Sequence, residues 1–160
     1  MGHAGPMDRL THSDSVIVAR PPDELYAMIS DITRMGEWSP VCTACWWDEG
    51  EGPRVGAWFT GRNELPERTW ETRSEVVAAD PGREFAFVVH GTIARWGYSF
   101  APVGGGTELT ESWEFLPSGM ELFGERFGDD APAQIADRLE RAQTGIPATL
   151  AAIKRAAESA

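Results

Sequence analysis

The stretch that decides the fold is Ala131 to Glu158, APAQIADRLERAQTGIPATLAAIKRAAE, in this 160-residue chain. Its apolar residues recur at steps of three or four, a spacing typical of one amphipathic helix with a single apolar face. They are Ile135, Leu139, Ala142, Ile146, Leu150, Ile153 and Ala157. A helix of about 28 residues is about 42 Å long, so we expect a whole curved sheet to cover that face.

Two helix-breaking residues, Gly145 and Pro147, lie inside this stretch. The apolar spacing keeps its phase across both of them. Proline removes one backbone hydrogen bond and bends a helix at that point. We therefore predict a kink in one continuous helix, and not a break into two.

The middle of the chain has the alternation and the turn residues of antiparallel strands. We predict six strands near 41–48, 55–63, 68–79, 83–90, 93–101 and 107–116. A further strand over 13–20 ends at Pro21-Pro22. Together they predict a seven-stranded antiparallel sheet with this first strand on one edge, an α+β fold.

Two short helices are expected between the first strand and the second. Pro22 and the acidic residues after it favour a helix ending near Ser30, and Asp31 is placed to cap a second short helix. Residues 117–130 are apolar but rich in glycine, which predicts an irregular connection that acts as a flap. Residues 1–12 are expected to form a disordered tail, and residues 13–158 a single domain.

Several short motifs follow one another in an order that is specific when taken together. They are Arg20-Pro21-Pro22-Asp23-Glu24-Leu25-Tyr26, Ser30 to Pro40 (SDITRMGEWSP), Gly56-x-x-Phe59-x-Gly61-x-Asn63, Pro81-Gly82-x-x-Phe85 and Gly106-Thr107-x-Leu109-Thr110-Glu111-x-Trp113. From about Ser13 to Ala157 the chain resembles the START-like (SRPBCC) superfamily, in its polyketide cyclase/dehydrase branch. The resemblance implies a helix-grip fold, in which a curved sheet wraps around a long C-terminal helix. It does not specify the chemistry, because members of the superfamily differ widely in use.

Acidic residues outnumber basic ones by 25 to 14, which gives a formal net charge of −11. A surface of this sign repels nucleic acid and anionic membranes, so neither is an expected partner. No stretch approaches the roughly 18 apolar residues of a membrane span, and the N-terminus has no apolar signal region. We expect no membrane insertion and a cytoplasmic location.

Cys42 and Cys45 have the spacing of a redox or zinc motif. They lie in a predicted strand, where positions three apart point to opposite faces. No second cysteine pair exists, and the three histidines are scattered. We predict two structural thiols, no metal site and no cofactor.

Alternation along the strands assigns an inner face to the sheet. Charged residues such as Arg62 and Arg73 belong outside, which sends their neighbours inward. The inner set mixes aromatic with polar side chains, as small-molecule pockets do, although a solid core with an internal polar network fits the same pattern. With three helix residues, the predicted ligand-binding set is Phe59, Asn63, Trp70, Thr72, Ser74, Phe85, Phe87, Trp96, Tyr98, Glu111, Trp113, Ile135, Leu139 and Ile146.

Three of the polar residues are candidates for moving protons. If aromatic neighbours enclose Glu111, desolvation raises its pKa, as suits a general acid or base. The alternatives are a salt bridge to Arg95 or another arginine, or a face assignment that is off by one residue. Tyr98 could donate a hydrogen bond to a ligand carbonyl, or to a backbone group. His90 lies beside a turn, either as a proton carrier at a pocket mouth or simply as a turn-flanking residue.

These observations predict a protein that binds a small or medium hydrophobic ligand, such as a lipid, a polyketide or an aromatic ring system. The alternative is a cofactor-independent cyclase or dehydratase that uses Glu111, Tyr98 or His90 for proton transfer. A third possibility is an interaction or stress-associated protein that acts through its surface. Exposure of Trp58 and of Trp46 or Trp47 would favour that role or a homodimer.

Overall fold

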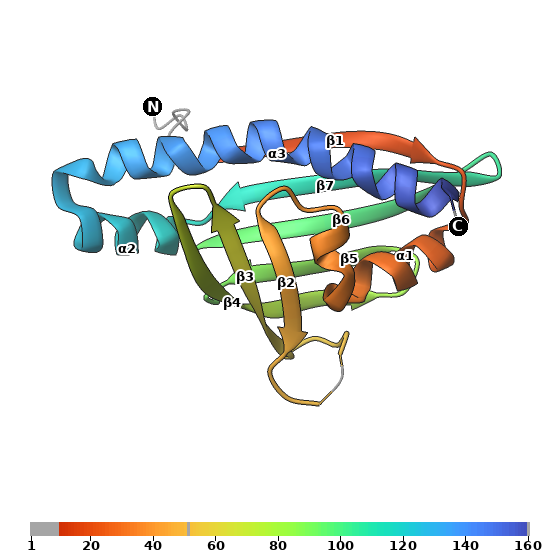
Figure 1. Cartoon of the computed structure of the whole chain (residues 1–160), viewed down its shortest axis with the longest axis horizontal. Coiled ribbons are helices and arrows are strands. Elements are labelled where there is room, and N and C mark those ends of the chain that lie inside the picture. The colour runs from red at the N-terminus through yellow and green to blue at the C-terminus, as the bar shows by residue number, and fades with distance from the viewer. Residues whose placement is uncertain (1–9, 51, 160) are drawn as a thin grey trace, which may run out of the picture.

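A curved antiparallel sheet with one long helix across it makes up most of the molecule (Figure 1). The computed structural model describes residues 10–50 and 52–159. The seven strands are β1 (Leu10–Val18), β2 (Cys42–Trp47), β3 (Trp58–Leu65), β4 (Arg68–Asp80), β5 (Glu84–Val89), β6 (Ala94–Val103) and β7 (Gly106–Phe115). Their order in the sheet is β1-β7-β6-β5-β4-β3-β2, with every pair antiparallel, so the predicted sheet and its edge strand are confirmed.

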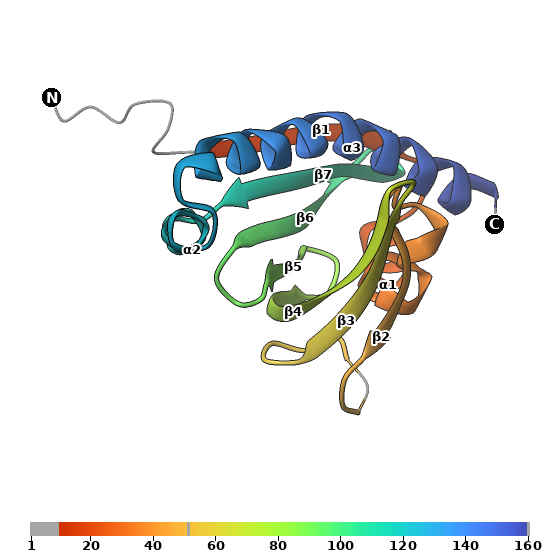
Figure 2. The same cartoon turned by 60° about the vertical axis from the view of Figure 1, so that its left-hand side comes forward.

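The long helix α3 (Ala131–Ser159) continues through Pro147 without a break, as predicted. Its buried residues include Ile135, Ile146 and Ile153, which belong to the apolar stripe of the sequence. Among the sheet strands, α3 packs against β1 and β7. Figure 2 shows the helix arching over this side of the sheet, while β2, β3 and β4 curve away below it.

Two short helices join β1 to β2. In α1 (Pro22–Ser30) proline occupies the first turn, and Leu25, Tyr26 and Ile29 are buried. The 3-10 helix η2 (Ile32–Glu37) begins where the carboxylate of Asp31 accepts a hydrogen bond from the Thr33 backbone N–H. Both helices are where the sequence predicts them.

The first strand starts earlier than its side-chain pattern suggests. Leu10 pairs with Phe115 and Val18 with Thr107, so β1 runs along nearly the whole of β7. The prediction of a disordered tail over residues 1–12 is therefore wrong for residues 10–12, and residues 1–9 lie outside the described residues. Backbone hydrogen bonds to a neighbouring strand do not require the apolar alternation used to predict the strand.

The expected irregular flap over residues 117–130 is also wrong, because most of it is helical. Helix α2 (Pro117–Phe127) is followed by a single 3-10 turn, η3 (Gly128–Asp130). Phe123 packs edge-to-face on Phe115 and on Phe127, with both pairs of ring centroids 5.1 Å apart. Gly119 is needed for this docking, because a Cβ there would lie 2.4 Å from the Ile93 carbonyl oxygen. Tertiary packing thus overrides a glycine-rich sequence.

Truncation of Ile153 to Ala tests how strongly the α3 stripe stabilises the fold. The Ile153 side chain is fully buried, and its loss should lower the free energy of unfolding by about 2 to 5 kcal/mol. Urea denaturation followed by circular dichroism measures this change. The exposed Gln143 of the same helix provides the control, since Gln143→Ala should change stability by no more than about 0.5 kcal/mol. Similar losses in both variants would contradict this account of the stripe.

Candidate functional site

A cavity of about 500 Å³ lies between the concave face of the sheet, η2, α2 and α3. Six of the seven strands, β2 to β7, contribute residues to its wall. The helices contribute residues as well, among them Met35 of η2, Phe123 of α2 and Thr149 of α3. The predicted pocket between sheet and long helix is therefore present.

Aromatic rings form much of the wall on the sheet side. Phe59 of β3 meets Phe87 of β5 edge-to-face, with ring centroids 5.0 Å apart. Trp113 of β7 lies between Trp96 and Phe115, and its ring centroid is 6.5 Å from that of Trp96 and 6.0 Å from that of Phe115. Such tilted contacts hold the rings in place beside the cavity.

Most of the predicted ligand-binding residues do line this cavity. The ones that do are Phe59, Asn63, Trp70, Thr72, Ser74, Phe87, Trp96, Tyr98, Glu111 and Trp113. Phe85, Ile135, Leu139 and Ile146 do not. Phe85 packs instead on Tyr26 of α1, and the three helix residues belong to the core or pack on its edge.

The helix contributes a different set of residues from the predicted one. Its apolar stripe faces the core, and the adjacent stripe faces the cavity, with Arg138, Arg141, Gly145 and Thr149 at steps of three and four. Successive residues of an α-helix are rotated by about 100° about its axis, so these two stripes point in different directions. The cavity therefore lies beside the packed face of the helix and not beneath it. In the sequence, the signal that could have identified this cavity-facing stripe was its basic residues, which lie next to the apolar ones.

Glu111 is the most unusual group in the wall. It is 3% exposed on β7, and its Oε2 accepts a hydrogen bond from the Tyr98 hydroxyl at 3.1 Å. Its Oε1 has no hydrogen-bond partner, the single such buried side-chain atom among residues 10–50 and 52–159. Burial raises the pKa of Glu111 to about 8, against the smaller lowering effect of the Tyr98 hydrogen bond.

The alternative partner for Glu111, Arg95, is not available to it. The Arg95 guanidinium donates to Glu84 at 2.9 Å, on the other face of the sheet. Tyr98 is buried as well, and desolvation followed by the nearby Glu111 raises its pKa well above the usual value. At neutral pH both groups therefore carry their protons, which makes them hydrogen-bond donors in the cavity wall.

His90 lies at the rim of the cavity, on the turn between β5 and β6. Its backbone has a φ of 53°, a conformation that residues other than glycine rarely adopt. Partial burial, with Arg126 and Arg73 nearby, lowers its pKa. His90 is therefore neutral at pH 7, and it does not share a hydrogen bond with Glu111 or Tyr98.

Cys42 and Cys45 both line the cavity, contrary to the prediction that they point to opposite faces. A register shift between Cys42 and Ala44 inserts one residue into β2, so residues three apart come to the same side. Their sulfur atoms are 3.1 Å apart, and both side chains are buried. A Cβ added at Gly61 would lie 3.2 and 3.3 Å from these two sulfurs. The glycine thus makes room for the thiol pair.

Other polar groups of the wall are bonded to one another. Asn63 donates from Nδ2 to the Thr72 hydroxyl at 3.2 Å, across the β3–β4 ladder.

No group of three or more His, Cys, Asp or Glu residues that could hold a metal ion is found in the described part of the chain. No helix in that part is long and apolar enough to cross a membrane.

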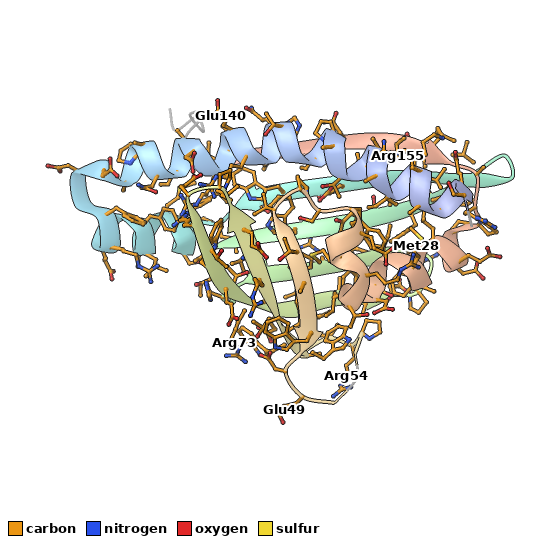
Figure 3. The ribbon with its side chains drawn as sticks, in the orientation of Figure 1. Met28, Glu49, Arg54, Arg73, Glu140 and Arg155 are labelled. Carbon is orange, nitrogen blue, oxygen red and sulfur yellow. The ribbon has the colours of Figure 1, made fainter. Side chains whose placement is uncertain are left out.

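The tryptophans of the convex face do not form one apolar patch. Trp46 is 38% exposed. Trp58 is half-buried, and the guanidinium of Arg73 lies 4.8 Å above its ring. Arg73 also pairs with Asp48 at 2.7 Å, near the lower end of the sheet (Figure 3). Trp47 instead packs on Phe59 of the cavity wall, with ring centroids 5.7 Å apart. This convex face therefore gives little support to a protein that acts through an apolar surface.

Replacing Glu111 by Gln should alter the pH dependence of stability. Because the folded-state pKa is raised to about 8 from 4.5, the unfolded chain loses this proton first. The free energy of unfolding then falls as pH rises through this window, by at most about 5 kcal/mol at about 1.4 kcal/mol per pKa unit. Urea denaturation at about pH 5 and about pH 8 measures this fall. Between the two, the free energy of unfolding should decrease less for Glu111→Gln than for the wild type.

Glu108 of the same strand is exposed, so Glu108→Gln is the matched control for this measurement. It should keep the wild-type pH dependence. Parallel stability curves for the wild type and Glu111→Gln would contradict the raised pKa.

Comparison with known proteins agrees with this fold and cavity. The chain matches, over residues 9–158, a family described as polyketide cyclase / dehydrase and lipid transport. A polyketide cyclase-like protein from Corynebacterium glutamicum, solved in solution by NMR, is 56% identical, with a TM-score of 0.68, over 94% of this chain and 92% of that one. No curated protein matches significantly.

More distant structures share the fold alone. The di-domain ARO/CYC protein StfQ from the steffimycin biosynthetic pathway is 18% identical, with a TM-score of 0.70, over 94% of this chain and 51% of that one. The protein Ara h 8.0201 is 15% identical, with a TM-score of 0.63, over 95% and 99%. With the family match over nearly its whole length, the chain belongs to the polyketide cyclase/dehydrase and lipid transport family.

Proposed function

We propose that this protein binds a small or medium hydrophobic molecule in the cavity between the sheet and α3. The observation that carries the proposal is an aromatic cavity of about 500 Å³ with the unpartnered Glu111 Oε1 in its wall. Ligand pockets in proteins span about 300 to 1,000 Å³ and combine apolar walls with a few polar groups. The family description, which includes lipid transport, supports the same role.

The polar groups at Glu111 suggest which end of a ligand they receive. A neutral carboxyl group can donate one hydrogen bond from Oε1, and a buried polar atom left without a partner costs about 1 to 3 kcal/mol. A ligand carbonyl or hydroxyl oxygen placed there would remove that cost. The ligand is therefore expected to be a mainly apolar molecule, such as a lipid, polyketide or aromatic ring system, that carries at least one neutral oxygen.

A side chain introduced at Gly145 should block the cavity. Gly145 lines the wall on α3, and a Cβ there has as its nearest neighbour within 4 Å the Pro40 Cγ atom, at 3.9 Å. Gly145→Phe should lower affinity for the neutral probe N-phenyl-1-naphthylamine by about tenfold or more, because the new ring occupies ligand space. Titration followed by probe fluorescence and by quenching of the native tryptophans gives the dissociation constant.

Ala148 is exposed on the same helix, so Ala148→Phe is the matched control and should bind the probe as the wild type does. Circular dichroism establishes that both variants fold. Equal affinities in Gly145→Phe and Ala148→Phe, or no probe binding to the wild type, would overturn the proposal.

A cyclase or dehydratase activity is a second candidate, and the paired Glu111 and Tyr98 favour it. Their hydrogen bond of 3.1 Å and the raised pKa of Glu111 provide a proton donor that remains protonated near pH 7. A general acid of this kind could protonate a ketone oxygen during an aldol-type ring closure, while the cavity folds the chain into a reactive geometry.

Turnover of a linear poly-β-ketone surrogate, followed by mass spectrometry, tests this candidate. Glu111→Gln should slow ring closure by about 100-fold, because a positioned general acid contributes about that much. Tyr98→Phe should also slow it. Glu108→Gln serves as the control. Rates that are the same in all these proteins would remove Glu111 and Tyr98 from any mechanism.

A further inference from the structure

The cavity has a cationic rim in a strongly acidic protein. Four arginines line it, Arg68, Arg126, Arg138 and Arg141, although the whole chain has a net charge of −11. Two carboxyl groups also line it. One is the buried Glu111, which holds its proton at neutral pH, and the other is Glu71, whose carboxylate lies 3.8 Å from Arg62. Positive charge therefore dominates the cavity wall.

Three of these arginines converge on the aromatic side chains at one end of the cavity. Arg68 and Arg141 both lie over the ring of Trp70, with guanidinium carbons 4.2 and 5.8 Å from its centroid. Arg68 and Trp70 come from the start of β4, and Arg141 comes from α3. Figures 1 and 2 both show the tip of the β3–β4 hairpin close to α3. Arg138, one turn earlier on the helix, lies 5.1 Å from the centroid of Phe123.

The arginines of this rim outnumber the carboxylates that pair with them. Asp137 is shared by two of the arginines, at 3.0 Å from Arg141 and 3.4 Å from Arg138. No carboxylate of the described residues lies within 4.0 Å of Arg68 or Arg126. Burial and then repulsion from Arg141 lower the pKa of Arg138, against the raising effect of Asp137, and Arg68 adds a smaller lowering effect. Arg138 is therefore close enough to both of the other arginines for their positive charge to act on it.

Like charges held at a partly buried site are costly unless an anion joins them. Guanidinium groups match the oxygens of carboxylate, sulfonate and phosphate groups through paired hydrogen bonds, and aromatic rings beneath them keep the guanidinium planes in place. A ligand with an apolar body in the cavity and an oxyanion at one end would satisfy both parts of the wall.

We propose that the ligand is an amphipathic anion whose oxyanion end binds at the rim formed by Arg68, Arg138 and Arg141. This inference rests on the proposed ligand-binding function. Its apolar body contacts the rings of the sheet, and a neutral oxygen farther along it meets Glu111. The two ends of the cavity therefore select different oxygen chemistry, anionic at the arginines and neutral at the carboxyl group.

Displacement of the bound neutral probe N-phenyl-1-naphthylamine by three twelve-carbon compounds tests the proposal. Dodecanoate and dodecyl phosphate carry an oxyanion, and dodecan-1-ol does not. The wild type should prefer the better anion over the alcohol by about tenfold or more. Added salt should reduce that preference. The ranking of the two anions identifies which oxyanion the rim accepts.

Arg138→Gln and Arg141→Gln should each reduce the preference for anions over dodecan-1-ol several-fold, measured as the ratio of the two displacement constants within each variant. Arg155 is exposed on the same helix (Figure 3), so Arg155→Gln is a control of equal charge change and should keep the wild-type preference. A loss of anion preference as large in Arg155→Gln as in the rim variants would show a general charge effect and overturn the site.

The outcomes separate the two proposals. If the wild-type protein does not bind the neutral probe, the binding function fails and this inference fails with it. If the probe binds and dodecan-1-ol displaces it as well as either anion does, the cavity is a binding site without anion selectivity. In that case only the assignment of the arginine rim is wrong.

Discussion

The packing of α3 along one side of the curved sheet is the constraint on which the rest of the structure depends. The apolar stripe of the helix packs against β1, β7 and the core between them. The sheet continues through β6 to β2 and curves away from the helix (Figure 2). Its concave face is too wide for one helix to fill, so a cavity of about 500 Å³ remains between them. The same packing that stabilises the domain thus creates the site.

The electrostatic environment within the cavity differs between Glu111 and the arginines. Glu111 is desolvated on β7, so its pKa rises to about 8 and it remains neutral. Arg68, Arg138 and Arg141, by contrast, are half-buried or exposed. Charge is tolerated where a side chain is exposed to water, and is disfavoured where burial desolvates it. One wall can therefore offer both neutral and charged hydrogen-bond donors to a single molecule.

Local departures from regular structure decide which side chains meet inside the cavity. One extra residue in β2 brings Cys42 and Cys45 to the same side, and Gly61 opposite leaves space for both sulfurs. The docking of α2 on Phe115 through Phe123 closes one end. Neither feature follows from period-two or period-3.6 patterns, because a bulge and a docking site are properties of two segments together.

The sequence by itself determined the order of elements, the faces of β3 to β7 and the long helix, because alternation and apolar spacing follow directly from backbone geometry. On that basis Glu111, Tyr98 and eight further residues of the wall could be predicted. Only the tertiary structure decided how α3 is rotated about its axis, which places Arg138 and Arg141 at the cavity and Ile135 and Ile146 in the core. That rotation depends on the curvature of the sheet and on the fit of side chains across the interface, which no repeat within one segment records.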